Sequence, residues 1–207
     1  HTLEASHNFR GDILKEECAA LGVPCGYASG NPSDYAIAQQ IVHDADTQIG
    51  GKMIAYINND GVVDGARLPD LSPAEYRELL DVHFMTLFNC VKTAADHMAK
   101  QGGGQFINTV CMMGFPGTEP DFGLEISLYE AFTRSFAKTY APMNVRFNTI
   151  LIAPLAYPQD PQDPNREPEL PREDGGPVHP PMSTESPDEF LDLIVKIVES
   201  PAMNGQV

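Results

Sequence analysis

Cationic side chains are scarce in this chain of 207 residues. It holds 13 lysines and arginines against 29 aspartates and glutamates, which gives a formal net charge of −16. Proteins bind nucleic acid mainly through cationic contacts to phosphate, and anionic membrane surfaces attract basic segments. The composition therefore argues against a nucleic-acid partner and against an anionic membrane.

Long apolar runs and paired cysteines are also absent from the sequence. No apolar run approaches the ~20 residues that span a bilayer. The cysteines form no C-x-x-C pair and no Cys/His cluster with zinc spacing; they are Cys18, Cys25, Cys90 and Cys111. We expect reduced, mostly buried thiols in a cytoplasmic protein without a metal site. No signal peptide is recognisable, although the first residue is His1 rather than methionine.

Three helix starts carry a capping pattern in which Ser or Asn precedes Pro. They are Asn31-Pro32, Ser72-Pro73 and Ser186-Pro187. The predicted helices run over 33–49, 73–101 and 187–199. The second ends at Gly102-Gly103-Gly104, which we interpret as a C-cap and not as a phosphate-binding loop.

Short apolar segments between the helices predict strands at 53–57, 105–110 and 145–152. Apolar strands that alternate with helices indicate a parallel sheet covered on both faces, in one α/β domain over 1–207. The stretch 155–186 is dense in proline and acids, so it cannot form a regular helix or a central strand. It is predicted to be a long loop, either a surface tether or a lid over a pocket.

The predicted helix 73–101 is apolar around its whole circumference, so both of its sides need cover. The sheet can cover one side. A second subunit could cover the other, together with the helix at about 123–140, or the chain could cover both helices alone. The residues expected at a subunit interface are Phe84, Phe88, Val91, Met98, Tyr129, Phe132, Phe136 and Tyr140.

The order of several motifs resembles the short-chain dehydrogenase/reductase family. Asn58-Asn59-Asp60-Gly61 is similar to the family's Asn-Asn-Ala-Gly turn, and 145–150 is similar to its Arg-Val-Asn strand. The stretch 79–83 resembles the segment that carries a structural or catalytic Asn, and 204–207 resembles the Thr-Gly-Gln stretch before the last strand. The resemblance implies a Rossmann-like, doubly wound parallel sheet with helices on both faces.

In that family a Ser, a Tyr and a Lys carry out proton transfer at a carbonyl or alcohol oxygen, and the Lys also holds the cofactor's ribose. Carried over by position, the Ser falls at Cys111, the Tyr at Phe122, the Lys at Ile126 and the Asn at His83. Phe has no hydroxyl and Ile has no ammonium, so neither can transfer a proton.

Shifting the alignment along this helix does not restore the family's Tyr and Lys together. If Tyr129 served as the family's Tyr, then Thr133 would stand at the position of the Lys. The resemblance therefore implies a degenerate catalytic site in either register.

The cofactor site is degenerate as well. The family's first strand, turn and helix carry a Gly-rich loop that approaches a pyrophosphate. The nearest spacing here, Ala5, Phe9 and Gly11, puts a bulky side chain where close approach is needed. Leu155 stands where family members place a Gly near the nicotinamide. We interpret the first βα unit as missing or truncated in this sequence.

Three functions remain open. The first is a non-catalytic subunit, a pseudoenzyme that supports an active NAD-dependent dehydrogenase of the same family in a heterotetramer. This chain would then bind no cofactor, and its partner would bind NAD. The chain looks like the inactive kind of subunit found in the heteromeric dehydrogenase of anaerobic toluene breakdown, which oxidises 2-(hydroxybenzyl)succinyl-CoA.

The two alternatives are enzymes. One is a cofactor-independent lyase or isomerase that uses Cys111 and His83, with Asp121 or Glu125 as bases. The other is an ordinary NAD(P)-dependent reductase whose catalytic positions are misplaced by the alignment above.

Overall fold

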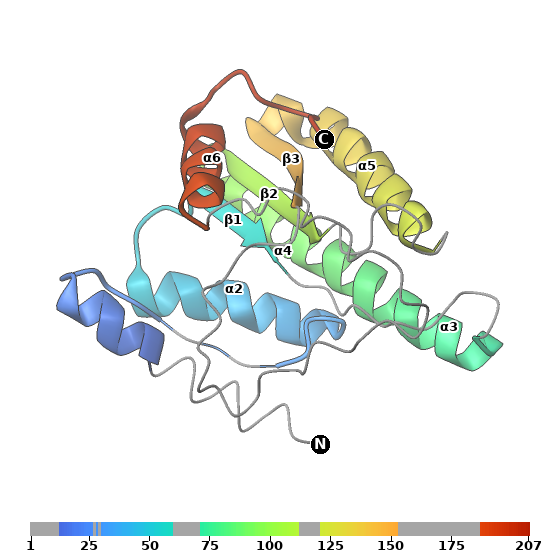
Figure 1. Ribbon diagram of the computed structural model, residues 1–207. Helices are drawn as coiled ribbons and strands as arrows, with labels where there is room; N and C mark the ends of the chain where they lie inside the picture. The colour runs from blue at the N-terminus through green and yellow to red at the C-terminus, as the bar shows by residue number, and fades with distance from the viewer. Residues whose placement is uncertain (1–12, 27, 29, 60–70, 112–120, 153–186) are drawn as a thin grey trace, which may run out of the picture.

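The computed structural model describes residues 13–26, 28, 30–59, 71–111, 121–152 and 187–207 (Figure 1). The predicted loop at 155–186, the motif around Phe9 and the cap at Ser186 lie outside the described residues.

Three parallel strands form the described sheet, in the order β1-β2-β3. They are β1 Ala55–Asn58, β2 Gly104–Cys111 and β3 Val145–Ile152. The prediction for β3 is confirmed exactly, and β2 is one residue longer at each end. The first strand begins later than predicted because the Met53 N–H donates to Gln101 Oε1 at 2.9 Å and does not join the ladder.

The described helices include α2 Tyr35–Ile49, α3 Pro73–Leu80, α4 Thr86–Lys100, α5 Asp121–Tyr140 and α6 Pro187–Glu199, and a further helix covers 13–20. The capping box at Ser72 is confirmed, with both of its hydrogen bonds present. The cap predicted at Asn31 is wrong. Asp34 caps α2 by accepting the Ala36 N–H at 2.8 Å, while Asn31 accepts the Ser33 N–H in a preceding turn.

The single helix predicted over 73–101 is interrupted. A π-helical segment, Asp81–Met85, separates α3 from α4. The C-cap prediction at its end is confirmed: the Gly103 N–H donates to Met98 O at 2.9 Å and the Gly102 N–H donates to Ala99 O at 3.2 Å. Gly102 and Gly103 have φ of 88° and 121°, values that favour glycine.

Helices cover both faces of the sheet, as predicted. The main core lies between one face and helices α2, α4 and α5, and centres on Phe106 and Phe147, whose rings stack at 5.3 Å. On the other face Ile107, Ile150 and Ile152 pack against Ile194 and Ile197 of α6. Figure 1 shows α6 apart from α4 and α5, with the strands between.

The all-round apolarity of α4 is explained largely within the chain. Its sides contact the sheet, α2 and the π-helical segment, and Phe88 meets Phe136 of α5 edge to face at 6.5 Å. Ala94, Ala95 and Met98 have no exposed surface. Of the two predicted covers, the chain itself provides most, and a second subunit stays a prediction for the smaller area that remains exposed.

The last residues run along the outer edge of β3. The Gly205 N–H donates to Phe147 O at 2.6 Å, and the Thr149 N–H donates to Gln206 O at 2.9 Å. The Asn148 side chain adds two bonds, accepting the Gln206 N–H and donating to Met203 O. The backbone groups of Phe147 and Thr149 at this edge of the sheet are thereby hydrogen-bonded. Among the described helices none is long and apolar enough to cross a membrane.

Candidate functional site

The residues that align with the family's catalytic positions lie at the carboxyl edge of the sheet or in the helices next to it. Cys111 is the last residue of β2, and α5 carries Phe122 and Ile126 in its first turns. His83 lies in the π-helical segment. The side chains of these four residues lie outside the described part of the structure, so their predicted roles are placed by backbone position alone.

A row of buried polar side chains crosses the three strands at one level. Asn58, Asn108 and Thr149 are register partners on β1, β2 and β3. Asn58 Nδ2 donates to Asn108 Oδ1 at 2.8 Å, and both side chains are at most 4% exposed. Among the described residues the Asn108 Nδ2 group has no hydrogen-bond partner. Burying an amide without a hydrogen bond costs free energy. The bond between Asn58 and Asn108 therefore favours the observed register of β1 against β2.

The row continues onto α5 through two hydroxyls. Thr133 Oγ1 donates to Tyr129 O at 2.7 Å and lies 2.5 Å from Thr149 Oγ1. Because the one Thr133 proton goes to the helix carbonyl, the Thr149 hydroxyl donates across the gap. Both threonines are 5% exposed. This contact locks the rotation of α5 against β3.

That rotation also settles where Tyr129 lies. Its side chain is 3% exposed, belongs to the main core, and its ring is 6.4 Å from that of Phe84. Tyr129 and Thr133 therefore face the sheet and α4. The register-shifted alternative, with Tyr129 as the proton donor, places the phenol inside the core, where a substrate carbonyl has no access.

Sequence reasoning missed this polar row. Asn108 and Thr109 interrupt an otherwise apolar strand, and such buried polar residues are the available signal. Thr109 Oγ1 bonds to Asn58 O at 3.2 Å and to Asn59 Oδ1 at 2.5 Å. The motif at Asn58-Asn59 therefore has a structural use in this chain: it ties the end of β1 to β2.

Two described helix starts are closed to a phosphate group. A dinucleotide's pyrophosphate needs free N–H groups at a helix start and is repelled by carboxylates there. The Asp34 carboxylate occupies the start of α2, and Glu75 completes the capping box of α3. The residues at these two starts do not fit a nicotinamide dinucleotide.

The cavity beside the polar row is too small for a dinucleotide. It measures about 10 Å³, lies beside Asn108 between Leu87, Phe132 and Phe147, and is no larger than one water molecule requires. No group of three or more His, Cys, Asp or Glu among the described residues could hold a metal ion.

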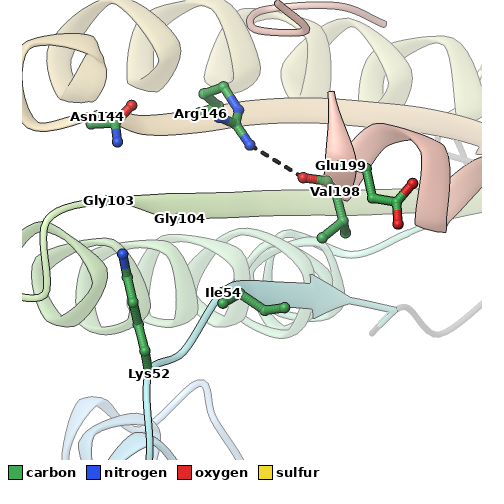
Figure 2. Close-up of a pocket in the computed structure, with 8 residues that line it drawn as sticks. All are labelled: Lys52, Ile54, Gly103, Gly104, Asn144, Arg146, Val198 and Glu199. Carbon is green, nitrogen blue, oxygen red and sulfur yellow. Dashed lines mark hydrogen bonds between the residues drawn. The ribbon is translucent and has the colours of Figure 1, made fainter. Parts of the chain in front are cut away.

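A larger open cavity of about 350 Å³ lies at the opposite, amino-terminal edge of the sheet (Figure 2). It is lined by Lys52, Ile54, Gly103, Gly104, Asn144, Arg146, Val198 and Glu199. Arg146 donates to Gln105 Oε1 at 2.8 Å and to Val198 O, at the end of α6, at 3.3 Å. Ligands of open parallel sheets bind at the carboxyl edge, so we assign Arg146 to holding α6.

The predicted interface residues divide into two groups. Val91, Met98, Tyr129 and Tyr140 are at most 8% exposed, because they fill the core between α4, α5 and the sheet. Their burial removes them from the accessible surface and corrects that part of the prediction. The other four form what we call the aromatic surface: Phe84, Phe88, Phe132 and Phe136.

The aromatic surface is a connected ladder of rings. Phe132 stacks on Phe136 at 5.5 Å, Phe84 lies 6.2 Å from Phe132, and Phe88 meets Phe136 edge to face. Phe88 is 39% exposed, and the neighbouring Met85 is 42% exposed. The rings join α4 to α5 while leaving part of their area open to solvent.

A hydrogen-bonded polar group joins the same two helices about one to two turns beyond Phe88 and Phe136. Tyr140 OH donates to Asp96 Oδ1 at 2.7 Å, and Lys92 Nζ lies 2.9 Å from Asp96 Oδ2. Burial, followed by the bond to Asp96, raises the pKa of Tyr140. Burial acts to raise the pKa of Asp96, but the bonds from Tyr140 and Lys92 outweigh it and lower that pKa.

Comparison with known proteins decides the family. A model of the short-chain dehydrogenase family matches residues 3–159. The chain belongs to this family. A 3alpha-hydroxysteroid dehydrogenase of Mediterraneibacter gnavus is 28% identical over 102 residues, which are 48% of this chain and 41% of that protein. The chain spans about half the length of the curated relatives it matches.

Solved structures agree on the fold. A short-chain dehydrogenase/reductase from Burkholderia xenovorans superposes with a TM-score of 0.74 at 20% identity, over 94% of this chain and 76% of that one. A variant of ElxO with NADPH bound has a TM-score of 0.68 at 15% identity, over 87% and 74%. At these identities the structures show the fold alone.

Proposed function

We propose that this chain is a non-catalytic subunit of the short-chain dehydrogenase type, which assembles with an active, NAD-dependent member of its family. The observation that carries the proposal is the burial of Tyr129 and Thr133, which argues against the shifted register. Both face the sheet, with Thr133 bonded to Thr149 and Tyr129 packed near Phe84. The resemblance puts the family's Tyr and Lys positions at Phe122 and Ile126, about two turns earlier on the same helix.

The chemistry supports this proposal. Hydride transfer to a carbonyl needs a nearby acid to protonate the developing alkoxide, and a phenol assisted by an ammonium supplies it in this family. A phenyl ring and a butyl side chain supply neither a proton nor a positive charge. The two acid-capped helix starts also offer no site for a cofactor's phosphates. The partner would therefore bind NAD and carry out the reaction.

The aromatic surface is the proposed contact with that partner. Phe88 and the neighbouring Met85 form its exposed apolar centre, and the charged pair Lys92 and Asp96 follows Phe88 about one turn along α4. An apolar centre with a polar rim is the usual composition of a protein interface. Exposed aromatic rings bury a large area on contact and lose little conformational freedom, so they suit a stable association.

Co-purification tests the proposal. The chain is expressed together with each complete short-chain dehydrogenase found in the neighbourhood of its gene, and the masses of the complexes are measured by native mass spectrometry. We expect a hetero-oligomer containing both chains, with a heterotetramer as the expected stoichiometry. Phe88→Asp should abolish the complex, and Leu191→Asp, at a 55% exposed position on α6, should leave it intact.

Activity measurements distinguish the alternatives. In calorimetric titrations the chain alone should bind neither NADH nor NADPH, and the complex should bind NADH. Tight binding of either cofactor by the isolated chain would contradict the proposal and favour an ordinary reductase. Cofactor-free turnover that Cys111→Ala and His83→Ala abolish would favour a lyase or isomerase.

A further inference from the structure

The chain reverses direction directly after the helix over 13–20. The Val23 N–H donates to Cys18 O at 2.9 Å, and the Gly22 N–H donates to Ala19 O at 3.0 Å. Gly22 has a φ of 70°, the left-handed conformation that such a helix end requires. The turn carries the following residues back along the last turn of the helix, so that Cys25 returns to Cys18.

The two thiols meet at this reversal. The Cys18 thiol lies within interaction range of the Cys25 thiol, and Cys25 Sγ donates to Gly26 O at 3.6 Å. Both cysteines are half-buried, whereas Cys90 is buried. Their separation of seven residues matches no C-x-x-C motif, so no sequence motif marks the pair. Desolvation, followed by the interaction with Cys25, raises the pKa of the Cys18 thiol.

The second thiol is carried by a segment that rests on α2. A Cβ built at Gly26 would lie 2.7 Å from Gln48 Oε1, and one built at Gly30 would contact Ile37. These close approaches place Gly26 and Gly30 against α2. The contact between Cys18 and Cys25 therefore joins the helix over 13–20 to a part of the chain held by the domain.

We propose that Cys18 and Cys25 form a reversible intrachain disulfide by exchange with a small-molecule disulfide such as oxidised glutathione. One protein thiol loses its proton and attacks the glutathione disulfide, which forms a mixed disulfide and releases one glutathione. The second protein thiol loses its proton, attacks the protein sulfur of the mixed disulfide and releases the second glutathione. Two protein thiols are oxidised and one glutathione disulfide is reduced to two thiols.

The fold favours this pairing because it holds the thiols in contact before reaction. A bond between prepositioned groups forms at a higher effective concentration than one between ends of a flexible loop. Closing it would tie the helix over 13–20 to the segment on α2. Amide hydrogen exchange of residues 13–26 should then slow on oxidation and recover on reduction.

Peptide mapping of the full chain tests the proposal. The chain is equilibrated in buffers of graded reduced and oxidised glutathione, quenched in acid, alkylated and digested with trypsin. The tryptic peptide 16–52 contains Cys18 and Cys25 and neither of the other cysteines. In oxidising buffers we expect this peptide to lose two hydrogens, to resist alkylation and to carry no glutathione.

Matched controls make the result decisive. Cys18→Ser should leave Cys25 as a glutathione adduct, and Cys90→Ser should leave the oxidation of peptide 16–52 unchanged. In urea, where the turn is lost, the same pair should need about tenfold more oxidised glutathione for half-closure. Three results would overturn the proposal: alkylation of both thiols in every buffer, glutathione adducts on both, or equal closure in the folded and unfolded chain.

Discussion

The contact between Thr133 and Thr149 can be tested by removing one hydroxyl at constant shape. Thr133→Val deletes the bond to Tyr129 O at 2.7 Å and the one shared with Thr149 at 2.5 Å. The Thr149 hydroxyl, 5% exposed, then loses the acceptor of its proton and has no access to water. The variant should fold, because Val fills the space of Thr.

The magnitude follows from the unpaired hydroxyl. A hydrogen bond contributes about 0.5–1.5 kcal/mol net, and a buried donor left unpaired costs about 1–3 kcal/mol. The added methyl group offsets part of this loss. We expect the free energy of unfolding to fall by about 2 kcal/mol, which lowers Tm by about 4–8 °C in a chain of this size.

A double-mutant cycle in urea measures the effect. Thr133→Val/Thr149→Val removes donor and acceptor together, so it should cost less than the sum of the single variants. Thr139→Val is the matched control: its hydroxyl bonds to Ser135 O at 2.9 Å on the exposed side of α5. That change should stay within about 0.5 kcal/mol.

Additive effects, or a loss at Thr133 no greater than at Thr139, would refute the rotation assigned to α5. They would free Tyr129 to face the carboxyl edge of the sheet and would remove the main support for a non-catalytic subunit.

Three further predictions concern the same scaffold. Gly103→Ala should cost more than Gly102→Ala in chemical denaturation, because only at Gly103 would the new Cβ strike the backbone of Asn144 in addition to the strain of a positive φ. Tyr140→Phe should destabilise the chain at neutral pH. The loss of unfolding free energy should shrink as pH falls below 3.8, the ordinary pKa of this group, and through the lowered pKa of Asp96. Protonation of Asp96 then removes from the wild type the stabilisation that the variant already lacks. A pH-independent difference between the two proteins would contradict this prediction. Asn89→Ala should cost about 1–3 kcal/mol, since its buried amide donates to two carbonyl oxygens before α2 at 3.1 and 2.8 Å; amide exchange at the start of α2 should then rise.

Local signals predicted most of the fold. The capping box at Ser72 and the Gly102–Gly103 C-cap rest on contacts between residues close in the sequence, so the sequence specifies them directly. The strand β3 is marked by its continuous apolar run, although its ladder partner β2 is distant in the sequence. The wrong cap at Asn31 is a local competition, in which Asp34 and Asn31 both offer an acceptor and the helix takes the nearer one.

The candidate site was less predictable because it depends on distant partners. The prediction that Phe122 and Ile126 replace the family's Tyr and Lys rests on their positions in the sequence alone. Exposure of the proposed interface residues could be predicted only in part, since Met98 and Phe88 look equally apolar in the sequence and differ only in what covers them. Burial is a property of the packed chain and not of the residue type.

The sequence by itself determined the family's order of strands and helices and the acidic net charge, and it carries the prediction that Phe122 and Ile126 replace the family's Tyr and Lys. Only the tertiary structure decided which way α5 faces, that a polar row joins three strands, and that two cysteines seven residues apart touch. The physical reason is range. Caps and apolar periodicity act within a few residues, whereas a hydroxyl or thiol gains its role from a partner that packing brings to it.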